Sequence, residues 1–245
     1  MLNESILKTL LPDTPVRVSE VTVSTNSDAK EWLMQGATHG SLIIARRQTG
    51  GKGRMGRSFA SAEGGLYMSI VLRSPCGAGE LTTLCAVAVR RAVRQLTGII
   101  LDIKWVNDLL HNGKKVCGIL CEGVWNGSIL LGYVAGIGLN VSQKEFPPDL
   151  KDIAASLYPD GNAPAGPEVF ASEIHKEIIR LLPGSPGHMA EYRSACLTLG
   201  KQIRWKKEEK TYTGIARDID NNGSLIAETE DGTFRIRSGE VSLEK

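Results

Sequence analysis

The sequence predicts an α+β fold in two domains, a large one over residues 1–199 and a small one over residues 200–245. Three observations support this prediction. Strand-like and helix-like segments are mixed along the chain up to residue 199. After Gly200 only short strand-like segments remain, and turn signals separate them. A length of 245 residues also suits one large and one small domain.

The first part of the chain contains two clear helical segments. Residues 28–34 follow several N-cap residues and are stopped by Gly36, whereas residues 79–96 carry one apolar face and are stopped by Gly98. Residues 1–14 form a short leader of one or two helical turns. Strands are expected at 15–23, 41–45 and 66–72.

Two Asn-Gly pairs predict β-hairpins in the middle of the chain. Asn112-Gly113 comes after a short strand that runs into Trp105 and is followed by another strand. Asn126-Gly127 lies inside the uncharged run 123–143, which is long enough to suggest a transmembrane helix. Because this hairpin signal and further glycines interrupt the run, it predicts two buried strands instead.

The composition of the chain changes over the last hundred residues. The proline-rich stretch 146–166 predicts a long loop, Pro167 fits the first position of a helix that ends at Pro183, and a second helix covers about 187–197. Four short strands, at 202–205, 211–216, 224–228 and 233–236, then predict a small antiparallel barrel.

The bulk composition excludes several classes of protein. Hydrophobic residues make up 42% and charged residues 23% of the chain, as in ordinary globular proteins. A net charge of +2 does not suggest a general nucleic-acid binder, and residues 1–14 are too few for a DNA-binding module. The five cysteines form no Cys-x-x-Cys pair, which disfavours a zinc site. With no signal peptide, we expect free thiols in the cytoplasm and no membrane span.

A basic, glycine-rich stretch at residues 45–57 dominates the sequence. It carries five cationic side chains and four glycines, and no Asp or Glu occurs between Glu31 and Glu63. Glycines let a backbone approach a ligand, and fixed cations beside it make a site for phosphate or carboxylate. A solvated basic loop is the alternative on composition alone.

The known nucleotide fingerprints do not fit this stretch. Gly51-x-Gly53-x-x-Gly56 matches the dinucleotide pattern in form, but loop residues follow where a helix is required, and no acid stands about 20 residues later. A Walker loop fails because Gly53, and not Ser or Thr, follows Lys52. The stretch therefore predicts another kind of anion site.

A second informative stretch runs from residue 101 to residue 121. The Asn-Gly turn within it would bring Lys104, Asn107, Asp108 and Lys115 around the mouth of one hairpin. An ordinary charged turn is the alternative for Lys115, and core packing is the alternative for Trp105.

Taken together, these motifs resemble those of biotin protein ligases. Residues 48–57 resemble the Gly-Arg-Gly-Arg-x-Gly loop of that family, and Lys104-Trp-x-Asn-Asp with Lys115 and Gly118 resembles its second signature. Residues 24–26 (Ser-Thr-Asn) and 136–140 (Gly-x-Gly-x-Asn) fit the same order. The resemblance covers about residues 15–245.

The resemblance implies a mixed β-sheet flanked by helices, like the catalytic domain of class II aminoacyl-tRNA synthetases, and an SH3-like C-terminal barrel. It implies that biotin and ATP, with Mg²⁺, give biotinyl-5′-adenylate and pyrophosphate. The acceptor lysine of a biotin carboxyl carrier protein domain then takes the biotinyl group. It further implies a monofunctional enzyme without a DNA-binding domain, and the sequence leaves a homodimer open.

The resemblance also assigns roles to individual residues. Lys115 and Arg54 are the expected catalytic cations, Lys115 bridging the biotin carboxylate and the α-phosphate. The residues expected to bind biotin are Ser24, Thr25, Asn26, Gln48, Gly51, Lys52, Gly53, Arg54, Lys115, Gly118 and Gly136. Those expected to bind ATP are Lys52, Arg54, Arg57, Lys104, Trp105, Asn107 and Asn140, with Asp108 and Asn140 as Mg²⁺ ligands.

Two positions depart from the family pattern. Lys52 stands where Arg is usual, which removes a bidentate donor, and Met55 stands where a second Arg is common. Two other functions stay open: a lipoate or octanoate ligase of the same superfamily, and a non-catalytic biotin-binding protein. Because a mixed anhydride hydrolyses, residues 48–63 are expected to be mobile without ligand and ordered with it.

Overall fold

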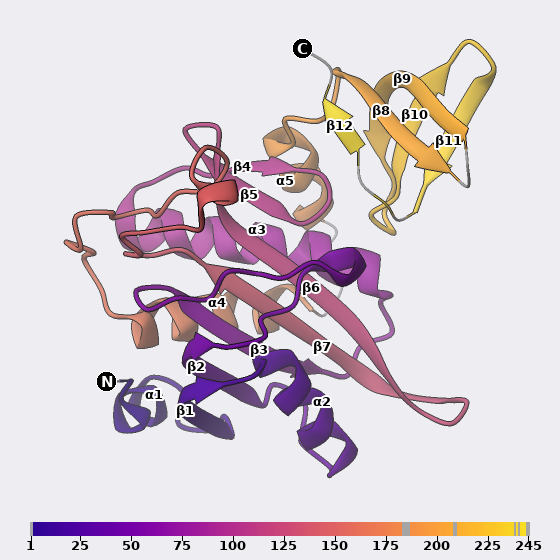
Figure 1. Ribbon diagram of the computed structural model, residues 1–245. Helices are drawn as coiled ribbons and strands as arrows, with labels where there is room; N and C mark the ends of the chain where they lie inside the picture. Colours follow the sequence, from indigo (N-terminus) through magenta and orange to yellow (C-terminus); the bar gives the residue numbers. More distant parts are fainter. Residues whose placement is uncertain (1, 183–186, 208–209, 238, 240, 244–245) are drawn as a thin grey trace.

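A seven-stranded mixed sheet forms the centre of the computed structural model, which describes residues 2–182, 187–207, 210–237, 239 and 241–243 (Figure 1). Its strand order is β1-β2-β3-β7-β6-β5-β4, with β1 and β2 parallel and all other pairs antiparallel. The strands are β1 (Val16–Thr22), β2 (Leu42–Gln48), β3 (Leu66–Leu72), β4 (Asp102–Lys104), β5 (Asp108–His111), β6 (Lys114–Asn126) and β7 (Ile129–Leu139).

Helices cover both faces of this sheet because successive residues of its inner strands are apolar on both sides. Ile44 and Ile70 belong to the large core under α3 and α4, whereas their neighbours Ile43 and Val71 pack against α2 with Leu33. The helices are α1 (Glu4–Leu10), α2 (Thr25–Met34), α3 (Ala78–Thr97), α4 (Pro167–Leu181) and α5 (Gly187–Ala195). Single 3₁₀ turns, η1 (Arg54–Gly56) and η2 (Pro148–Leu150), interrupt two loops.

A second, antiparallel sheet lies at one end of the first (Figure 1). Its order is β11-β10-β9-β8-β12, so β11 and β12 are its edges, and no pairing between these two closes a barrel within the described residues. The strands are β8 (Gln202–Lys207), β9 (Lys210–Ile219), β10 (Leu225–Thr229), β11 (Gly232–Ile236) and β12 (Val241–Leu243). This architecture is consistent with an SH3-like domain.

Hydrogen bonds join the second sheet to the body of the molecule. The Trp105 Nε1–H donates to the carbonyl of Gly223 at 3.0 Å, and Arg193 Nε donates to the carbonyl of Ile219 at 2.7 Å. The backbones also approach closely, because a Cβ added at Gly79 would lie 2.5 Å from the carbonyl oxygen of Asn222. The two sheets therefore share one continuous hydrophobic core.

Most expected elements are present, with three differences. Helix α2 begins at Thr25 and not at residue 28, because Ser24, in an extended conformation, is already the N-cap. Strand β5 is an additional short strand between Trp105 and the Asn112-Gly113 turn, and β12 was not anticipated. Both residues of that turn have positive φ, 52° and 77°, as a type I′ hairpin requires.

Candidate active site

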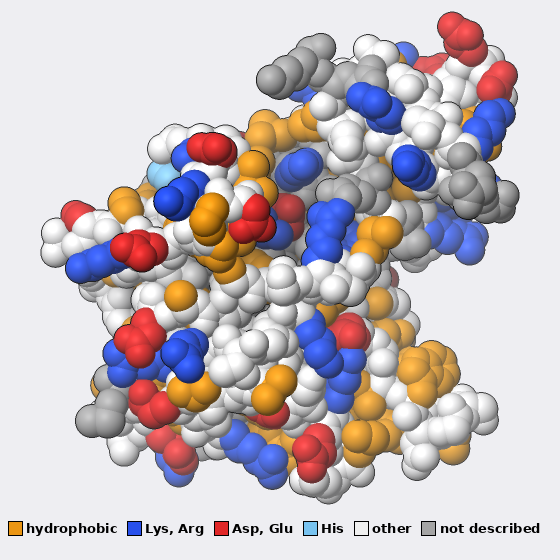
Figure 2. Space-filling model, in the orientation of Figure 1, with side chains coloured by type: hydrophobic (Ala, Val, Ile, Leu, Met, Phe, Trp, Pro, Cys, Tyr) orange, Lys and Arg blue, Asp and Glu red, His pale blue; other side chains and the backbone are white. Residues whose placement is uncertain are grey.

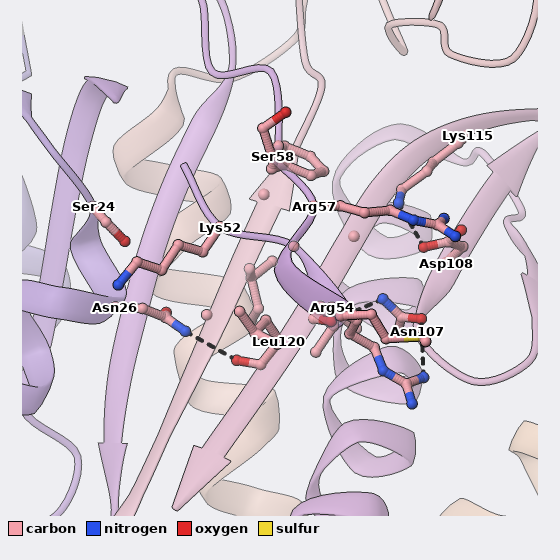
Figure 3. A pocket seen from close by; sticks show the side chains of 18 of the residues that line it. Ser24, Asn26, Lys52, Arg54, Arg57, Ser58, Asn107, Asp108, Lys115 and Leu120 are labelled. Atoms are coloured by element: carbon pink, nitrogen blue, oxygen red, sulfur yellow. Dashed lines mark hydrogen bonds and ion pairs between the residues drawn. The ribbon is translucent and has the colours of Figure 1, made fainter. Parts of the chain in front are cut away.

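One cavity opens on the face of the sheet that carries α2 and the glycine loop, and basic side chains surround its mouth (Figures 2 and 3). Four parts of the chain meet there: the start of α2, the loop after β2, the β4–β5 segment with the start of β6, and the middle of β7. The C-terminal region contributes Val241 of β12 and Gly239, which lies between β11 and β12, to the wall. Residues far apart in the sequence thus share one site.

The start of α2 is held rigidly at one end of the cavity. The side-chain oxygen of Gln48 accepts hydrogen bonds from Thr25 N–H at 2.8 Å and from Thr25 Oγ1 at 3.1 Å. Gln48 Nε2 donates to Ser61 Oγ at 2.8 Å, so the amide orientation of Gln48 is fixed. Ser24, which is 1% exposed, also lines this end, and its hydroxyl makes no capping bond to α2.

Asn26 lies deeper at the same end. Its Nδ2 donates to the carbonyl of Leu120 at 3.2 Å (Figure 3). The same nitrogen donates to Glu122 Oε2 at 2.9 Å. A Cβ at position 136 would lie 2.0 Å from Asn26 Oδ1, so only glycine fits opposite this amide.

The glycine loop brings cations over the cavity. Arg54 Nη1 lies 3.4 Å from Asn107 Oδ1, and Lys52 Nζ donates to Ser27 Oγ at 2.9 Å. Burial lowers the pKa of the Arg54 guanidinium from its ordinary value, and the charge of Asp108 opposes that shift. Arg57 lines the cavity beside them. This part of the site is therefore suited to anions.

The ring of Phe59 lies across the strands at the cavity floor. A Cβ at Gly138 would lie 2.4 Å from this ring, and a Cβ at Gly118 would lie 2.8 Å from it. The ring also lies 5.6 Å from Lys115 Nζ, within the range of a cation–π contact. The two glycines thus make room for an aromatic ring.

Lys115 and Asp108 form an ion pair at the opposite end of the cavity, with Nζ and Oδ1 2.6 Å apart. Both side chains are about one-third exposed or less, at 32% and 26%. Lys104 lines the cavity near them. Trp105 also lines it, although this side chain is 5% exposed and belongs to the hydrophobic core.

The structure brings together nearly all residues expected from the sequence. Arg54 and Lys115 face the same cavity, as the expected catalytic roles require. The other expected residues that line it are Ser24, Thr25, Asn26, Gln48, Lys52, Gly53, Arg57, Lys104, Trp105, Asn107, Asp108, Gly118 and Gly136.

Two expected residues, both described by the structure, do not line the cavity. Gly51 packs inside the loop, since a Cβ there would lie 2.5 Å from Ser61 Oγ and 2.6 Å from the Phe59 carbonyl oxygen. Asn140 is 4% exposed, and its Nδ2 donates to the carbonyl of Ala155 at 3.1 Å. Within the described residues, no cluster of three or more His, Cys, Asp or Glu could hold a metal ion, and no helix is long and apolar enough to cross a membrane.

Sequence reasoning missed part of the lining. The glycines of β6 and β7 were a signal for the cavity floor, whereas no particular residue of the C-terminal region was expected in the wall. The residues missed are Met55, Ser58, Phe59, Ile119, Leu120, Ile137, Gly138, Gly239 and Val241.

Known protein families match two parts of this chain. The pattern of the biotin/lipoate A/B protein ligase family matches residues 18–140, and that of the biotin protein ligase C-terminal domain matches residues 198–244. The bifunctional ligase/repressor BirA of Bacillus subtilis is 35% identical over 91% of this chain and 72% of its own length. The biotin–[acetyl-CoA-carboxylase] ligase of Mycobacterium tuberculosis is 34% identical over 90% of this chain and 85% of its own length.

A solved structure is similar over nearly the whole chain. The biotin protein ligase of Aquifex aeolicus, in complex with biotin and ATP, has a TM-score of 0.78 and 30% sequence identity with this chain. The similarity covers 94% of this chain and 99% of that one.

Proposed function

The chain belongs to the biotin/lipoate A/B protein ligase family, as a biotin protein ligase, and from this premise we propose how its cavity performs the reaction. The enzyme activates biotin with ATP to biotinyl-5′-adenylate, releasing pyrophosphate. It then transfers the biotinyl group to a lysine amine of a carrier protein, releasing AMP and a proton. The observation that supports this assignment most strongly is that Arg54 and Lys115 face the cavity whose other end is built by Thr25 and Gln48.

The first step brings together two anions, the biotin carboxylate and the α-phosphate of ATP. Their mutual repulsion must be offset by fixed cations in a site of low dielectric constant. Lys115 bridges the two anions in our proposal, and Arg54 stabilises the charge on the α-phosphate while pyrophosphate leaves. Lys52 and Arg57 add positive charge from the same loop, and Lys104 adds it from the β4–β5 segment.

Biotin also needs groups that recognise its ureido ring. Ser24, Thr25 and Gln48 supply hydroxyl, backbone and amide groups at one end of the cavity. The apolar floor of Phe59, Ile119 and Ile137 suits the ring system and the alkyl chain. We expect ATP at the opposite end, near Lys104, Trp105 and Asn107.

We propose that Mg²⁺ accompanies ATP, with Asp108 as a carboxylate ligand. Mg²⁺ commonly uses one or two protein carboxylates together with substrate phosphates, and Asp108 meets this minimum. When bound, the ion neutralises phosphate charge. Asn140 does not fit this role, because it is buried away from the cavity. Asp108 would leave Lys115 when ATP binds, which frees the lysine for its anionic partners.

Further proposals concern organisation and location. We propose that residues 1–199 bind biotin and ATP, and that residues 200–245 complete the ATP side of the wall through Val241. The acceptor is a biotin carboxyl carrier protein domain. All five cysteines are free thiols, which fits a reducing compartment such as the cytoplasm.

Exchange of labelled pyrophosphate into ATP tests the proposed function. Exchange should require biotin and should not occur with lipoate or octanoate as the only acid. Exchange that depends on lipoate would support the other branch of the family, and binding of biotin without any exchange would support a non-catalytic protein. Either result would overturn the proposal.

A further inference from the structure

Glu122 lies on β6 just beyond the cavity and outside the set of residues that line it. Its side chain is 28% exposed and contacts two residues of α2. Lys30 Nζ lies 2.5 Å from Glu122 Oε1, and Asn26 Nδ2 donates to Glu122 Oε2 at 2.9 Å. The carboxylate therefore has one oxygen for each partner.

All hydrogen-bond donors of the Asn26 side-chain amide, and its oxygen, have partners within the protein. Its two amide hydrogens go to Glu122 and to the carbonyl of Leu120, and its Oδ1 lies 2.7 Å from the hydroxyl of Ser69. Asn26 is 5% exposed, and its side chain packs directly against the backbone of Gly136. Because no amide hydrogen remains for a ligand, Asn26 cannot serve as a donor to biotin while this arrangement holds.

The same contacts continue to the polar end of the cavity. Ser69 Oγ lies 2.8 Å from Thr25 Oγ1, and Thr25 in turn is held by Gln48 through its backbone N–H. Ser69 is fully buried and Thr25 is 3% exposed. Few alternative partners exist for groups so deeply buried, so a change at one end of the chain of bonds affects the other.

We infer that Glu122 is a positioning residue for biotin recognition, which holds the Asn26 amide and thereby the first turn of α2 in its binding geometry. This inference rests on the proposed function. Lys30 keeps the half-buried carboxylate compensated, and Leu120, Ser69 and Gly136 fix the remaining sides of Asn26. Asn26 acts through its neighbours in this scheme and is not itself a donor to the ureido ring.

Steady-state pyrophosphate exchange with Glu122→Ala and Glu122→Gln tests the inference. Removal of the acceptor leaves a buried N–H of Asn26 without a partner, so Glu122→Ala should raise the KM for biotin about tenfold or more. The KM for ATP should stay within about twofold, since that end of the cavity is unchanged. Glu122→Gln keeps an oxygen that accepts from Asn26 and should restore the KM for biotin to within about threefold of the wild-type value.

A matched control is Glu31→Ala, at an exposed position of α2, the helix that carries Asn26; among the described side-chain contacts, the Glu31 carboxylate accepts a hydrogen bond only from Gln35. This variant should leave both KM values unchanged. An unchanged KM for biotin in Glu122→Ala would overturn the inference, and so would an equal rise of both KM values. Absence of exchange in the wild-type protein would instead refute the proposed function.

A second pair of variants covers the case in which Glu122→Ala does not fold. Asn26→Asp places a carboxylate against Glu122 and should raise the KM for biotin. In the double variant Asn26→Asp/Glu122→Gln, the new glutamine amide can donate to the new carboxylate, with the polarity of the bond reversed. A lower KM for biotin in the double variant than in Asn26→Asp supports direct coupling, and additive effects exclude it.

Discussion

Lys115 Nζ lies 2.6 Å from Asp108 Oδ1, so the proposed catalytic cation is paired with a carboxylate across the β5–β6 hairpin. The pair is partly exposed, and such pairs contribute about 1 kcal/mol or less to stability. The proximity places a negative charge where two anionic substrates are expected. In the proposed reaction, this pair must therefore separate before Lys115 can contact both anions.

Lys115→Ala should reduce biotin-dependent pyrophosphate exchange by about 100-fold or more, because it removes a fixed charge at the reacting centre. The protein should stay folded, as shown by circular dichroism and by a nearly unchanged Tm. Lys114→Ala is the control, since Lys114 is exposed and bonds to the carbonyl of Lys151 outside the cavity. Normal exchange in Lys115→Ala would mean that another group supplies the charge, and an unfolded variant would point to a structural role.

Trypsin should cut the free enzyme within residues 48–63, where Lys52, Arg54 and Arg57 lie in a loop whose Met55 is 70% exposed. Biotin together with ATP should slow this cleavage about tenfold or more, since the loop must order over the adenylate to exclude water. Cleavage after Lys151, in another exposed loop, serves as the internal reference. Equal rates with and without ligands would argue against loop closure.

Gly79→Ala should weaken the attachment of the second sheet, because the added Cβ would lie 2.5 Å from the carbonyl oxygen of Asn222. Overpacking of this kind costs about 1–3 kcal/mol, visible as a lower Tm. The KM for ATP should also rise, since the neighbouring Gly223 carbonyl holds Trp105 at the cavity.

The matched control for this variant is Gly77→Ala. No atom lies within 4 Å of a Cβ at that position, so both the Tm and the KM for ATP should stay close to wild-type values. If the two alanine variants behave alike, the close approach at residue 79 does not hold the sheets together.

The free energy of unfolding should fall as the pH is lowered below about 6.5, the ordinary pKa of histidine. Burial lowers the pKa of His175, and its ring bonds to the carbonyl of Gly40 at 2.7 Å, which opposes the shift only in part. The unfolded chain therefore binds a proton at a higher pH than the folded protein does, and stability rises with pH in that window. Denaturant unfolding of wild type and His175→Phe at pH 8 and pH 5.5 measures the effect. The free energy of unfolding should change less between pH 8 and pH 5.5 in the variant than in the wild type. An equal change in both proteins would exclude His175 as a source of the pH dependence.

The sequence predicted that Lys104, Asp108 and Lys115 surround one hairpin because turn chemistry is local. Only the resemblance to biotin protein ligases implied that the glycine loop meets this hairpin. Asn112 and Gly113 both adopt the positive φ that the hairpin needs, and this turn returns Lys115 toward Asp108. Helix α3 was equally predictable from the sequence, because its apolar face and the Gly98 C-cap belong to one continuous segment. Local signals therefore carried most of the architecture.

Non-local geometry explains the remainder. The expected role of Asn140 depended on which way a side chain at the end of β7 points, and the loop around Ala155 captures its amide instead. Phe59 was not anticipated, because its place on the floor follows from two glycines on strands distant in sequence. The second sheet ends at β12, an edge strand of only three residues, and such a short strand was not recognised from the sequence.

The contribution of Val241 to the cavity wall has a consequence for biosynthesis. The residues proposed to recognise biotin are synthesised well before β12 (Val241–Leu243). A nascent chain can thus assemble its central sheet while one side of the cavity is still open to water. Under the proposed function, the cavity can exclude water on this side only after β12 has been synthesised.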